Sequence, residues 1–395
     1  MTSLDLEPLL DRNRVDREVP AGAPFDPWRL KILGPDELRL LSPAVQLAYL
    51  ASYGLLAPTS HNTIPERFRL LPEEHAIEVW LDRTSVLPAA DVVGRQAMVN
   101  LGCVVANVRC AARAFGWAEE VDLYPVDVRD TGPAKPGEPR HLRIARVRFH
   151  PGGSEPAGPD LLRAMLARKI VRAEYDDRVK LPPEAVQHMH DVVHGYEGLV
   201  LHLLTDAATL LFFAKFQELA EVTVFNRDAF AMELGDWLLE NDSTSLVGMR
   251  GREFGLSDEA ARRIHRGLRR EIELLPDEIA SFTKASNVAV RTSAAVAIIT
   301  VEEDSVPLRV RAGQAFEEIA LGLGPWRLAT AMQAGVVEVD VPNLALRGRL
   351  RTSRRPTAVF RIGRPLREED WHRPHASRPL LETLLLTDED VRASS

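Results

Sequence analysis

Apolar and polar residues follow two different periods along this chain, and together these predict a mixture of helices and strands. Apolar residues that recur every three to four positions predict helices over residues 42–56, 90–115, 160–169, 182–194 and 307–332, with further helices from 205 to about 240. Alternating or short apolar runs bounded by turn residues predict strands over residues 67–71, 76–81, 142–149, 198–204, 288–301 and 357–362. Strands therefore occur among helices along the whole chain, as in an α+β protein.

The order of these elements is partly repeated. Each half of the chain carries a strand, a long apolar helix and another strand. Between the halves, residues 151–159 (PGGSEPAGP) are rich in proline and glycine, which is typical of a linker. We therefore expect an N-terminal extension at 1–42, broken by several prolines, a first module at 43–150, this linker, and a second module at 160–395. The pattern predicts a duplicated α+β module.

Composition places the chain among globular proteins with a large core. It has 395 residues, of which 45% are hydrophobic and 27% are charged, and this excludes the fibrous, disordered and membrane classes. The formal net charge of -8 argues against a nucleic-acid partner, because nucleic-acid binders usually carry a basic face.

Cysteine usage and the N-terminus predict a cytoplasmic protein. Cys103 and Cys110 lie in one predicted helix, which would separate them by roughly 10 Å, too far for a disulfide. We interpret both as small buried helix residues. Residues 1–7 lack the basic and apolar regions of a signal peptide. The most apolar stretch, 199–216, is interrupted by a histidine and an aspartate, so we expect no membrane span.

The segment 58–63 (PTSHNT) directly follows the first predicted helix and concentrates polar side chains. Hydroxyls, an imidazole and an amide offer many donors and acceptors, which suit the edge of a flat heterocycle or an anion. A polar loop that merely caps the next element has the same composition. The segment alone therefore does not decide between a binding loop and a structural one.

Two basic segments of the second module are candidates for binding phosphate. Arg168, Lys169 and Arg172 lie within five residues near a predicted helix start, where guanidinium and backbone N–H groups favour anions. A solvated charged face is the alternative. Residues 371–379 (WHRPHASRP) form a basic, polar tail, which would either close a phosphate pocket or be disordered.

The sequence lacks the signatures of several other chemistries. Of His188, His190 and His194, only the last two share a helix face, and the apolar stripe around them is typical of a core helix, so we predict no metal. The glycine run at 321–325 lacks the strand–GxGxxG–helix context of a dinucleotide fold. A Walker lysine and a nucleophile-elbow serine are also missing. Kinases, Rossmann dehydrogenases and hydrolases in their familiar forms are therefore excluded.

Together these segments resemble the nitroreductase superfamily, whose members bind FMN. LAPTSHNTIPERFRL and IEVWLDRTSVLPAADVVGRQAMVNLGCVVANVRCAARAFGW are similar to the opening of that family, and ARKIVRAEYDDRVKLPPEAV is similar to its phosphate-binding start. RAGQAFEEIALGLGPWRLATAMQAGVVEV resembles its later core helix, and PTAVFRIGRP its late strand. Two such modules, covering roughly residues 43–380, resemble the fused, Acg-type members. The resemblance implies a nitroreductase-like α+β fold with an internal pseudo-dimer, and leaves a further homodimer open.

The resemblance also implies one FMN site per chain. In the family, one subunit gives a basic helix start and a basic tail to the phosphate, and the other gives a polar loop to the ring and ribityl region. The corresponding residues here are Arg168, Lys169, Arg172 and Arg378 for the phosphate, and Pro58, Thr59, Ser60 and Asn62 for the loop. Arg172 would tune the reduced flavin and Asn62 would bind the pyrimidine edge. A second such site would need a basic start before residue 42 and a second loop near residue 225, and the sequence has neither.

Three positions depart from the family pattern. Fused members commonly read Asn-x-Gln-Pro-Trp, whereas this chain has Ile64 and Glu66 at the glutamine and tryptophan positions. Ile170 stands where a serine or threonine hydroxyl normally helps to bind phosphate. These changes imply an altered flavin affinity, a specialised substrate or a lost cofactor.

The function implied by the resemblance is an FMN-dependent oxidoreductase. Hydride would pass from NAD(P)H through the flavin to a nitroaromatic, quinone or other small organic acceptor, with no nucleic acid or membrane as partner. No catalytic acid or base is required of the protein, because the flavin carries the chemistry. Two alternatives stay open: a non-catalytic FMN-binding or FMN-sequestering protein, with residues 225–285 as a lid, and a flavin-free pseudoenzyme that serves as a scaffold.

Overall fold

The computed structural model of the protein describes residues 6, 9–11, 27–274, 276–373 and 375–394. Part of the predicted N-terminal extension, with Pro20 and Pro24, lies outside these residues, as does Pro374 of the predicted basic tail.

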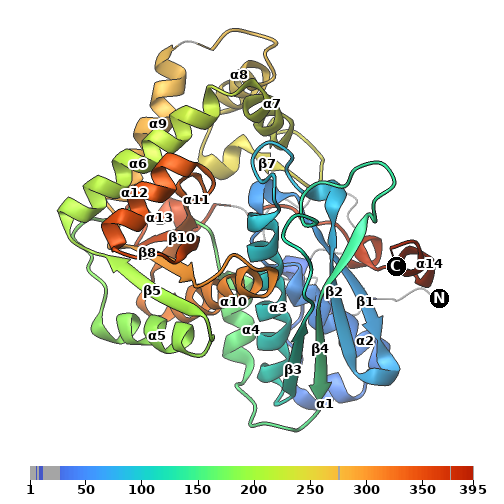
Figure 1. The fold of residues 1–395 in the computed structure, drawn as a ribbon. Helices are drawn as coiled ribbons and strands as arrows, with labels where there is room; N and C mark the ends of the chain where they lie inside the picture. The colour runs from blue at the N-terminus through green and yellow to red at the C-terminus, as the bar shows by residue number, and fades with distance from the viewer. Residues whose placement is uncertain (1–5, 7–8, 12–26, 275, 374, 395) are drawn as a thin grey trace.

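The first half of the chain folds around a four-stranded antiparallel sheet with the order β1-β2-β4-β3 (Figure 1). Its elements are α1 (Pro35–Arg39), α2 (Pro43–Gly54), β1 (Glu66–Leu71), β2 (Ala76–Asp82), α3 (Arg95–Ala114), β3 (Ala118–Leu123) and β4 (His141–His150). Helix α2 begins at Pro43 because the hydroxyl of Ser42 caps it by accepting the N–H of Val45. The sheet packs on α2 and α3.

The second half of the chain builds a second antiparallel sheet with the order β5-β8-β10-β9. Its elements are α4 (Pro159–Ala167), α5 (Pro183–His194), β5 (Leu199–Leu204), β8 (Ala295–Val301), α10 (Val306–Gly322), β9 (Ala329–Met332), α11 (Gly335–Glu338), α12 (Asp340–Leu350) and β10 (Arg355–Gly363). Counted along the chain, both sheets have the order first, second, fourth, third, with the long helix between the second and third strands. The predicted α+β fold with two fused modules is confirmed.

A helical insertion separates the first two strands of the second sheet. It contains α6 (Ala207–Phe225), α7 (Asp228–Trp237), β6 (Leu238–Leu239), β7 (Met249–Arg250), α8 (Asp258–Leu268) and α9 (Pro276–Arg291). We call residues 205–294 the lid; the segment predicted as a lid, 225–285, lies within it. Figure 1 shows α6 and α9 rising from the second module, with α7 and α8 at the top of the molecule.

Two sets of hydrogen bonds attach the lid to the first module. Glu233 in α7 accepts the backbone N–H groups of Ala89 and Ala90, each at 2.8 Å. Asn62 and Gly248 exchange two hydrogen bonds of 3.0 Å, one from each residue. The lid is therefore bound to both modules although the sequence places it in the second.

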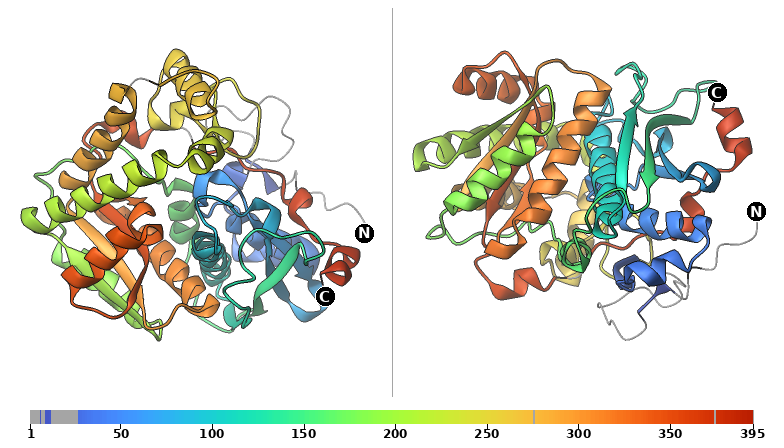
Figure 2. Two further views of the ribbon diagram at one scale, coloured as in Figure 1. Left: turned by 45° about the horizontal axis from the view of Figure 1, so that its top comes forward. Right: turned by 90° about the horizontal axis from the view of Figure 1, so that it is seen from below.

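The two modules meet along α3 and α10, which lie side by side at the centre of the molecule, with one sheet on either side (Figures 1 and 2). Gly102 and Gly313 stand where these helices are closest. A Cβ added to Gly102 would lie 2.1 Å from the carbonyl oxygen of Val310, and one on Gly313 would lie 1.9 Å from that of Val99. Only glycine permits this approach of two backbones.

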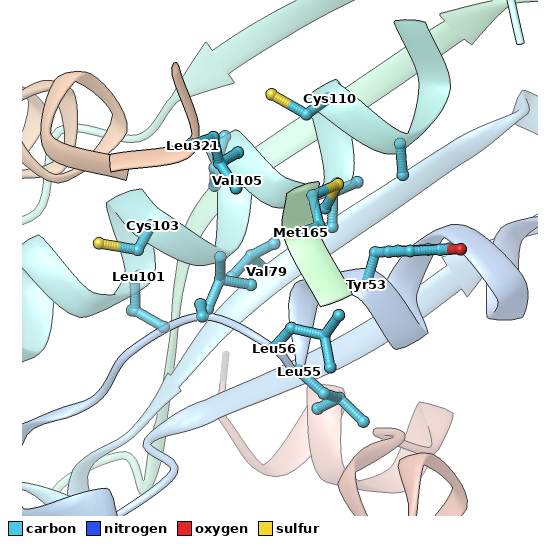
Figure 3. Packing of buried hydrophobic residues seen from close by; sticks show 14 of the residues in the cluster. Tyr53, Leu55, Leu56, Val79, Leu101, Cys103, Val105, Cys110, Met165 and Leu321 are labelled. Atoms are coloured by element: carbon cyan, nitrogen blue, oxygen red, sulfur yellow. The ribbon is translucent and has the colours of Figure 1, made fainter. Parts of the chain in front are cut away.

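One hydrophobic core continues across this boundary. Figure 3 shows Tyr53 at the end of α2, Leu101 in α3, Met165 in α4 and Leu321 in α10 within one buried cluster. The two cysteines of α3 are buried and free, as predicted. Within the described part of the chain, no helix is long and apolar enough to span a bilayer.

The C-terminal segment returns to the first module after β10, through α13 (Glu368–Trp371) and α14 (Asp388–Ala393). The N–H of Leu386 donates to the carbonyl of Phe68 in β1 at 2.8 Å. Upstream, the ring of His375 stacks on Trp28 at a centroid distance of 3.8 Å. The N-terminal extension and the basic tail therefore contact each other beside the first module.

Two predicted boundaries are wrong, one because of a local cap and the other because of a tertiary contact. Helix α3 begins at Arg95 and not at residue 90, since the side chain of Asp91 accepts the N–H groups of Gln96 and Ala97 and so caps the helix. The predicted strand 288–301 begins only at Ala295. Residues up to 291 continue α9, which packs along α6 despite its β-branched residues.

A third boundary is wrong at a proline. The helix predicted over 307–332 ends at Gly322, and Pro325 in the following turn cannot continue it. The chain then forms β9, which the sequence pattern did not predict. Strand β3 was also not predicted, because it is polar and half-exposed at a sheet edge. The other predicted helices and strands are confirmed to within a few residues.

Candidate functional site

Segments from both modules and the C-terminal tail line one small cavity of about 90 Å³. Seven of the eight predicted site residues lie in its wall: Pro58, Thr59, Asn62, Arg168, Lys169, Arg172 and Arg378. The eighth, Ser60, lines a neighbouring cavity of about 890 Å³ between the lid and the two modules. Residues more than 300 positions apart in sequence are thus brought together here.

The polar loop after α2 has an unusual backbone. His61, Asn62 and Ile64 have φ values of 49°, 55° and 51°, in the left-handed region that non-glycine residues seldom adopt. Each such residue costs on the order of 1 kcal/mol or more, and such residues persist only where surrounding contacts enforce them. Clusters of this kind are typical of binding sites.

Arg378 makes several of the contacts that hold this backbone in place. Its Nε donates to the carbonyl of Leu55 at 2.6 Å, Nη2 donates to that of Ala57 at 3.0 Å, and Nη1 donates to Oδ1 of Asn62. Arg168 acts beside it, because its Nη2 donates to the carbonyl of Leu56. The last carbonyls of a helix lack partners within the helix and attract cations. The two arginines therefore cap α2 and hold the loop.

These contacts limit what Arg168 and Arg378 can offer a ligand. The Nε of Arg168 also lies 2.8 Å from Oε1 of the buried Glu317. Both guanidinium groups line the small cavity, but each of the three side-chain nitrogens of Arg378 donates to the protein itself. The same holds for Asn62, whose Nδ2 donates to the carbonyls of Gly248 and Ser377 at 3.0 and 3.1 Å. Asn62 links the loop to the lid and to the tail.

Arg172 differs from these residues because it is exposed, and it lines the cavities. It lies over the ring of Phe254 at 5.2 Å, and within the described part of the chain it makes no hydrogen bond or ion pair. Enclosure by protein atoms lowers the pKa of Arg172, while nearby Glu253 opposes this effect. The small cavity, the 890 Å³ cavity and a third cavity of 230 Å³ all share Arg172.

The small cavity is electropositive and suits a phosphate group. Its wall contains the five cations Arg168, Lys169, Arg172, Arg373 and Arg378 and the two carboxylates Glu253 and Asp370. Lys169 donates to the backbone carbonyl of Arg373 at 2.7 Å, so its ammonium lies beside the backbone of Arg373. Asp370 binds Arg373 and partly neutralises it. The excess of cations favours a dianion.

The 890 Å³ cavity has the size of a cofactor and substrate site, since ligand pockets commonly measure roughly 300–1,000 Å³. Ser60 and His61 of the strained loop line it, together with aromatic residues of the lid. Burial and the charge of Arg172 lower the pKa of His61 to about 4, so its imidazole is neutral. A flat, mostly apolar heterocycle fits this wall.

Glu66 lies behind the loop and is fully buried. Neither carboxyl oxygen has a hydrogen-bond partner in the described part of the protein. Burial raises the pKa of Glu66 to about 7, although Arg378 and Arg67 partly offset this. The carboxyl group is therefore protonated in the folded protein at weakly acidic pH.

A pH-dependent stability follows from this shift. Between its ordinary pKa of 4.5 and about 7, Glu66 is ionised in the unfolded chain but protonated in the folded one. Unfolding then releases a proton, so the free energy of unfolding falls as pH rises, by roughly 3 kcal/mol in all. Glu66→Gln should remove this slope, and urea titrations at about pH 4.5 and 8 measure it. Exposed Glu73→Gln is the control, and parallel pH profiles for Glu66→Gln and the unmutated protein would contradict the assignment.

The second module offers no equivalent of the polar loop. By topology, the counterpart of residues 55–65 is the connection between α5 and β5, at residues 195–198, which is much shorter. The position predicted for it, near residue 225, is the end of α6 in the lid. His190 and His194 lie exposed on α5, and the described residues contain no group of three or more metal-ligating side chains.

Comparisons with known proteins point in one direction. No family model matches the chain. Over 146 residues it is 31% identical to the Mycobacterium tuberculosis protein named "Putative NAD(P)H nitroreductase acg", a match that spans 37% of each chain. The predicted resemblance to the nitroreductase superfamily is confirmed. An uncharacterized protein of the same organism is 29% identical over 123 residues, or 30% of this chain and 33% of that protein. The matches thus span only about a third of the length of these two relatives.

Solved nitroreductase structures are more distant. The crystal structure of a nitroreductase from Anabaena variabilis, described as putative, matches 90% of this chain and 95% of its own at 11% identity and a TM-score of 0.46. That of the FMN-dependent nitroreductase NfnB from Mycobacterium smegmatis in complex with NADPH matches 57% and 96% at 12% identity and a TM-score of 0.37.

The candidate site also contains residues that the sequence did not suggest. The largest group comes from the lid: Gln217, Glu221, Phe225, Phe230, Glu253 and Phe254. Trp28 of the N-terminal extension lines the small cavity as well. These residues are far in sequence from residues 58–62 and belong to no motif, so no local signal could have found them.

Proposed function

We propose that the protein is an FMN-dependent oxidoreductase that transfers hydride from NAD(P)H to a small organic acceptor. The strongest support is the meeting of residues 58–62 of the first module with residues 168–172 of the second at one electropositive cavity. The similarity to a protein named as an NAD(P)H nitroreductase is consistent with this chemistry. FMN, when bound, would accept the hydride and deliver it to the acceptor.

The side chains of this protein would bind FMN, orient it and enclose it. Lys169 and Arg373 present cations to a phosphate dianion. Arg172 stands where the three cavities meet, so we assign it to the negative charge of the reduced ring. Arg168 and Arg378 would act indirectly, because they hold the loop. The lid excludes water from the reacting ring.

A second function is favoured by one observation. The lid contributes much of the wall of the 890 Å³ cavity and is hydrogen-bonded to the first module through Glu233 and Asn62. A lid held in this way would suit a protein that sequesters FMN. The size of the cavity favours catalysis, because it leaves room for an acceptor beside a flavin.

The visible absorption spectrum of the purified protein tests both functions. Excess FMN is added and then removed by desalting, and the flavin retained per chain is measured. We expect about one FMN per chain, followed by rapid anaerobic bleaching with NADH or NADPH. Retained flavin that neither nucleotide reduces would support sequestration instead. No retained flavin would contradict both functions and favour a scaffold.

Arg172→Ala is expected to weaken FMN binding by about tenfold or more, since a charge-assisted contact is lost. The melting temperature of the flavin-free variant should be unchanged, because Arg172 makes no hydrogen bond or ion pair within the described residues. Fluorescence titration of FMN measures the affinity. His190→Ala, on the exposed face of α5, is the matched control and should leave binding intact. Equal affinities in the two variants would refute the role of Arg172.

A further inference from the structure

One part of the wall of the 890 Å³ cavity consists of side chains that accept hydrogen bonds. They are Asp91, Gln217, Glu221, Gln333 and Glu338. They come from three elements: the turn before α3, helix α6, and the segment that follows β9. We call these five residues the acceptor wall.

Their contacts place these residues next to one another. Gln217 donates to Oε1 of Glu221 at 2.9 Å. The amide of Gln217 also lies close to Gly335, since a Cβ there would be 3.2 Å from its Nε2. Glu338 is one turn further along α11 and raises the pKa of Asp91 through its charge. Gln333 lies two residues before Gly335 in the chain, so all five residues belong to one region of the cavity wall.

Two acceptors in this patch have no donor. Oε1 of Gln217 and Oε1 of Gln333 lack a hydrogen-bond partner in the described part of the protein. Their residues are only 4% and 8% exposed. A buried acceptor without a partner is unfavourable, so a ligand whose N–H groups bonded to these oxygens would be stabilised here.

The patch is also short of positive charge. Burial raises the pKa values of Asp91 and Glu221 to about 7, with Glu338 and Glu218 as like-charged neighbours. Arg95 is the cation beside Glu338, and it is shared with Asp304.

The other cations of the cavity are engaged elsewhere or lie at the flavin end. Arg263 is paired with Glu278, and Arg361 donates to backbone carbonyls. Arg172 lies at the junction with the small cavity. A cationic ligand would therefore relieve the charge deficit of the acceptor wall.

Another part of the cavity wall is apolar. Phe225 and Phe230 meet edge to face at 6.1 Å, and Phe254, Leu256 and Ile264 complete a lining from the lid. An aromatic or aliphatic body would bury its surface against these side chains. The cavity thus combines an apolar surface with an acceptor-rich, electronegative patch.

We infer that the substrate that receives the hydride carries an apolar, ring-containing body. It also carries a protonated amine or a similar cationic N–H donor, which binds the acceptor wall. The inference rests on the proposed function in so far as the ligand is the hydride acceptor. Binding of such a molecule does not itself depend on turnover, so the two can be tested separately.

Three probes of one size and different charge test this inference: 1-naphthylmethylamine, 1-naphthylmethanol and 1-naphthoate. Their affinities for the protein, prepared with added FMN, are measured by calorimetry at about pH 8, above the raised pKa values near 7. We expect the amine to bind about tenfold more tightly than the alcohol, because it adds charge-assisted hydrogen bonds, and the carboxylate to bind most weakly. Equal affinities, or tighter binding of the carboxylate, would overturn the inference.

A pair of variants on α6 identifies the patch. Glu221→Gln should reduce the preference for the amine over the alcohol severalfold. Glu218→Gln should not, because Glu218 bonds Asn287 and does not line the cavity. Melting temperatures check that both variants fold. An unchanged preference in Glu221→Gln would overturn the assignment to the acceptor wall.

The retained flavin is measured in the same samples. A protein that keeps no FMN but prefers the amine would refute the proposed function and support the charge preference. A protein that keeps FMN but does not prefer the amine would support the proposed function and refute the charge preference.

Discussion

Arg378→Ala is expected to lower the free energy of unfolding of the flavin-free protein by about 3 kcal/mol, because it leaves buried acceptors unpaired. The carbonyls of Leu55 and Ala57 and the side chain of Asn62 would all lose their guanidinium partner. The left-handed residues of the loop would then lose the contact that enforces them. Urea denaturation without FMN measures the effect.

The flavin-free condition distinguishes two roles for Arg378. If the residue served only the phosphate, as the sequence resemblance implied, its removal would leave the flavin-free protein as stable as before or relieve repulsion among the cations. Arg178→Ala is the matched control, since Arg178 is 82% exposed and pairs with nearby Asp176. Arg378→Lys should recover little stability, because an ammonium cannot bridge the same acceptors as a planar fork. Unchanged stability in Arg378→Ala would refute the capping role.

The periodic pattern of apolar residues predicted those elements that bury one face or one continuous run of residues. Helix α2 has a capping serine, a proline at its first position and a buried face, so each local signal agrees. Strand β10 is a nearly continuous buried run. Element order also predicted the duplication, which the identical strand orders of the two sheets show directly.

Prediction failed where distant contacts decide the structure. The end of α9 reads as a strand, yet Ser286 and Asn287 bond to Glu221 and Glu218 on α6 and keep it helical. The edge strand β3 is too polar to be recognised, and its pairing with β4 makes it a strand. The residues of α9 and β3 themselves do not indicate which elements they pair with.

The candidate site likewise has residues that the sequence predicted and contacts that it could not predict. The resemblance selected residues that the structure places around adjoining cavities, because short motifs persist at ligands. It did not reveal that Arg168 and Arg378 cap α2, since the carbonyls of residues 55–57 are far away in sequence. Nor did it reveal the lid residues, which reach the first module only through the fold.

Gly313→Ala should be the most damaging single-methyl change in the described part of the chain. Its new Cβ would lie 1.9 Å from the carbonyl oxygen of Val99 and 3.0 Å from Cα of Gly102, so α3 and α10 would have to separate. Overpacking of this kind costs about 3 kcal/mol or more, since backbone atoms cannot rotate away. The melting temperature should fall sharply, and flavin retention should fall with it, because residues from both modules line the site.

Gly348→Ala is the control for this prediction. Gly348 lies in α12 with no atom within 4 Å of its added Cβ, so alanine should stabilise the helix by about 0.5–1 kcal/mol. The two variants carry the same change in opposite surroundings, and their difference therefore measures the cost of separating the modules. A Gly313→Ala protein as stable as Gly348→Ala would mean that α3 and α10 can move apart freely. In that case the close contact of α3 and α10 would not be needed to hold the loop of the first module against the arginines of the second.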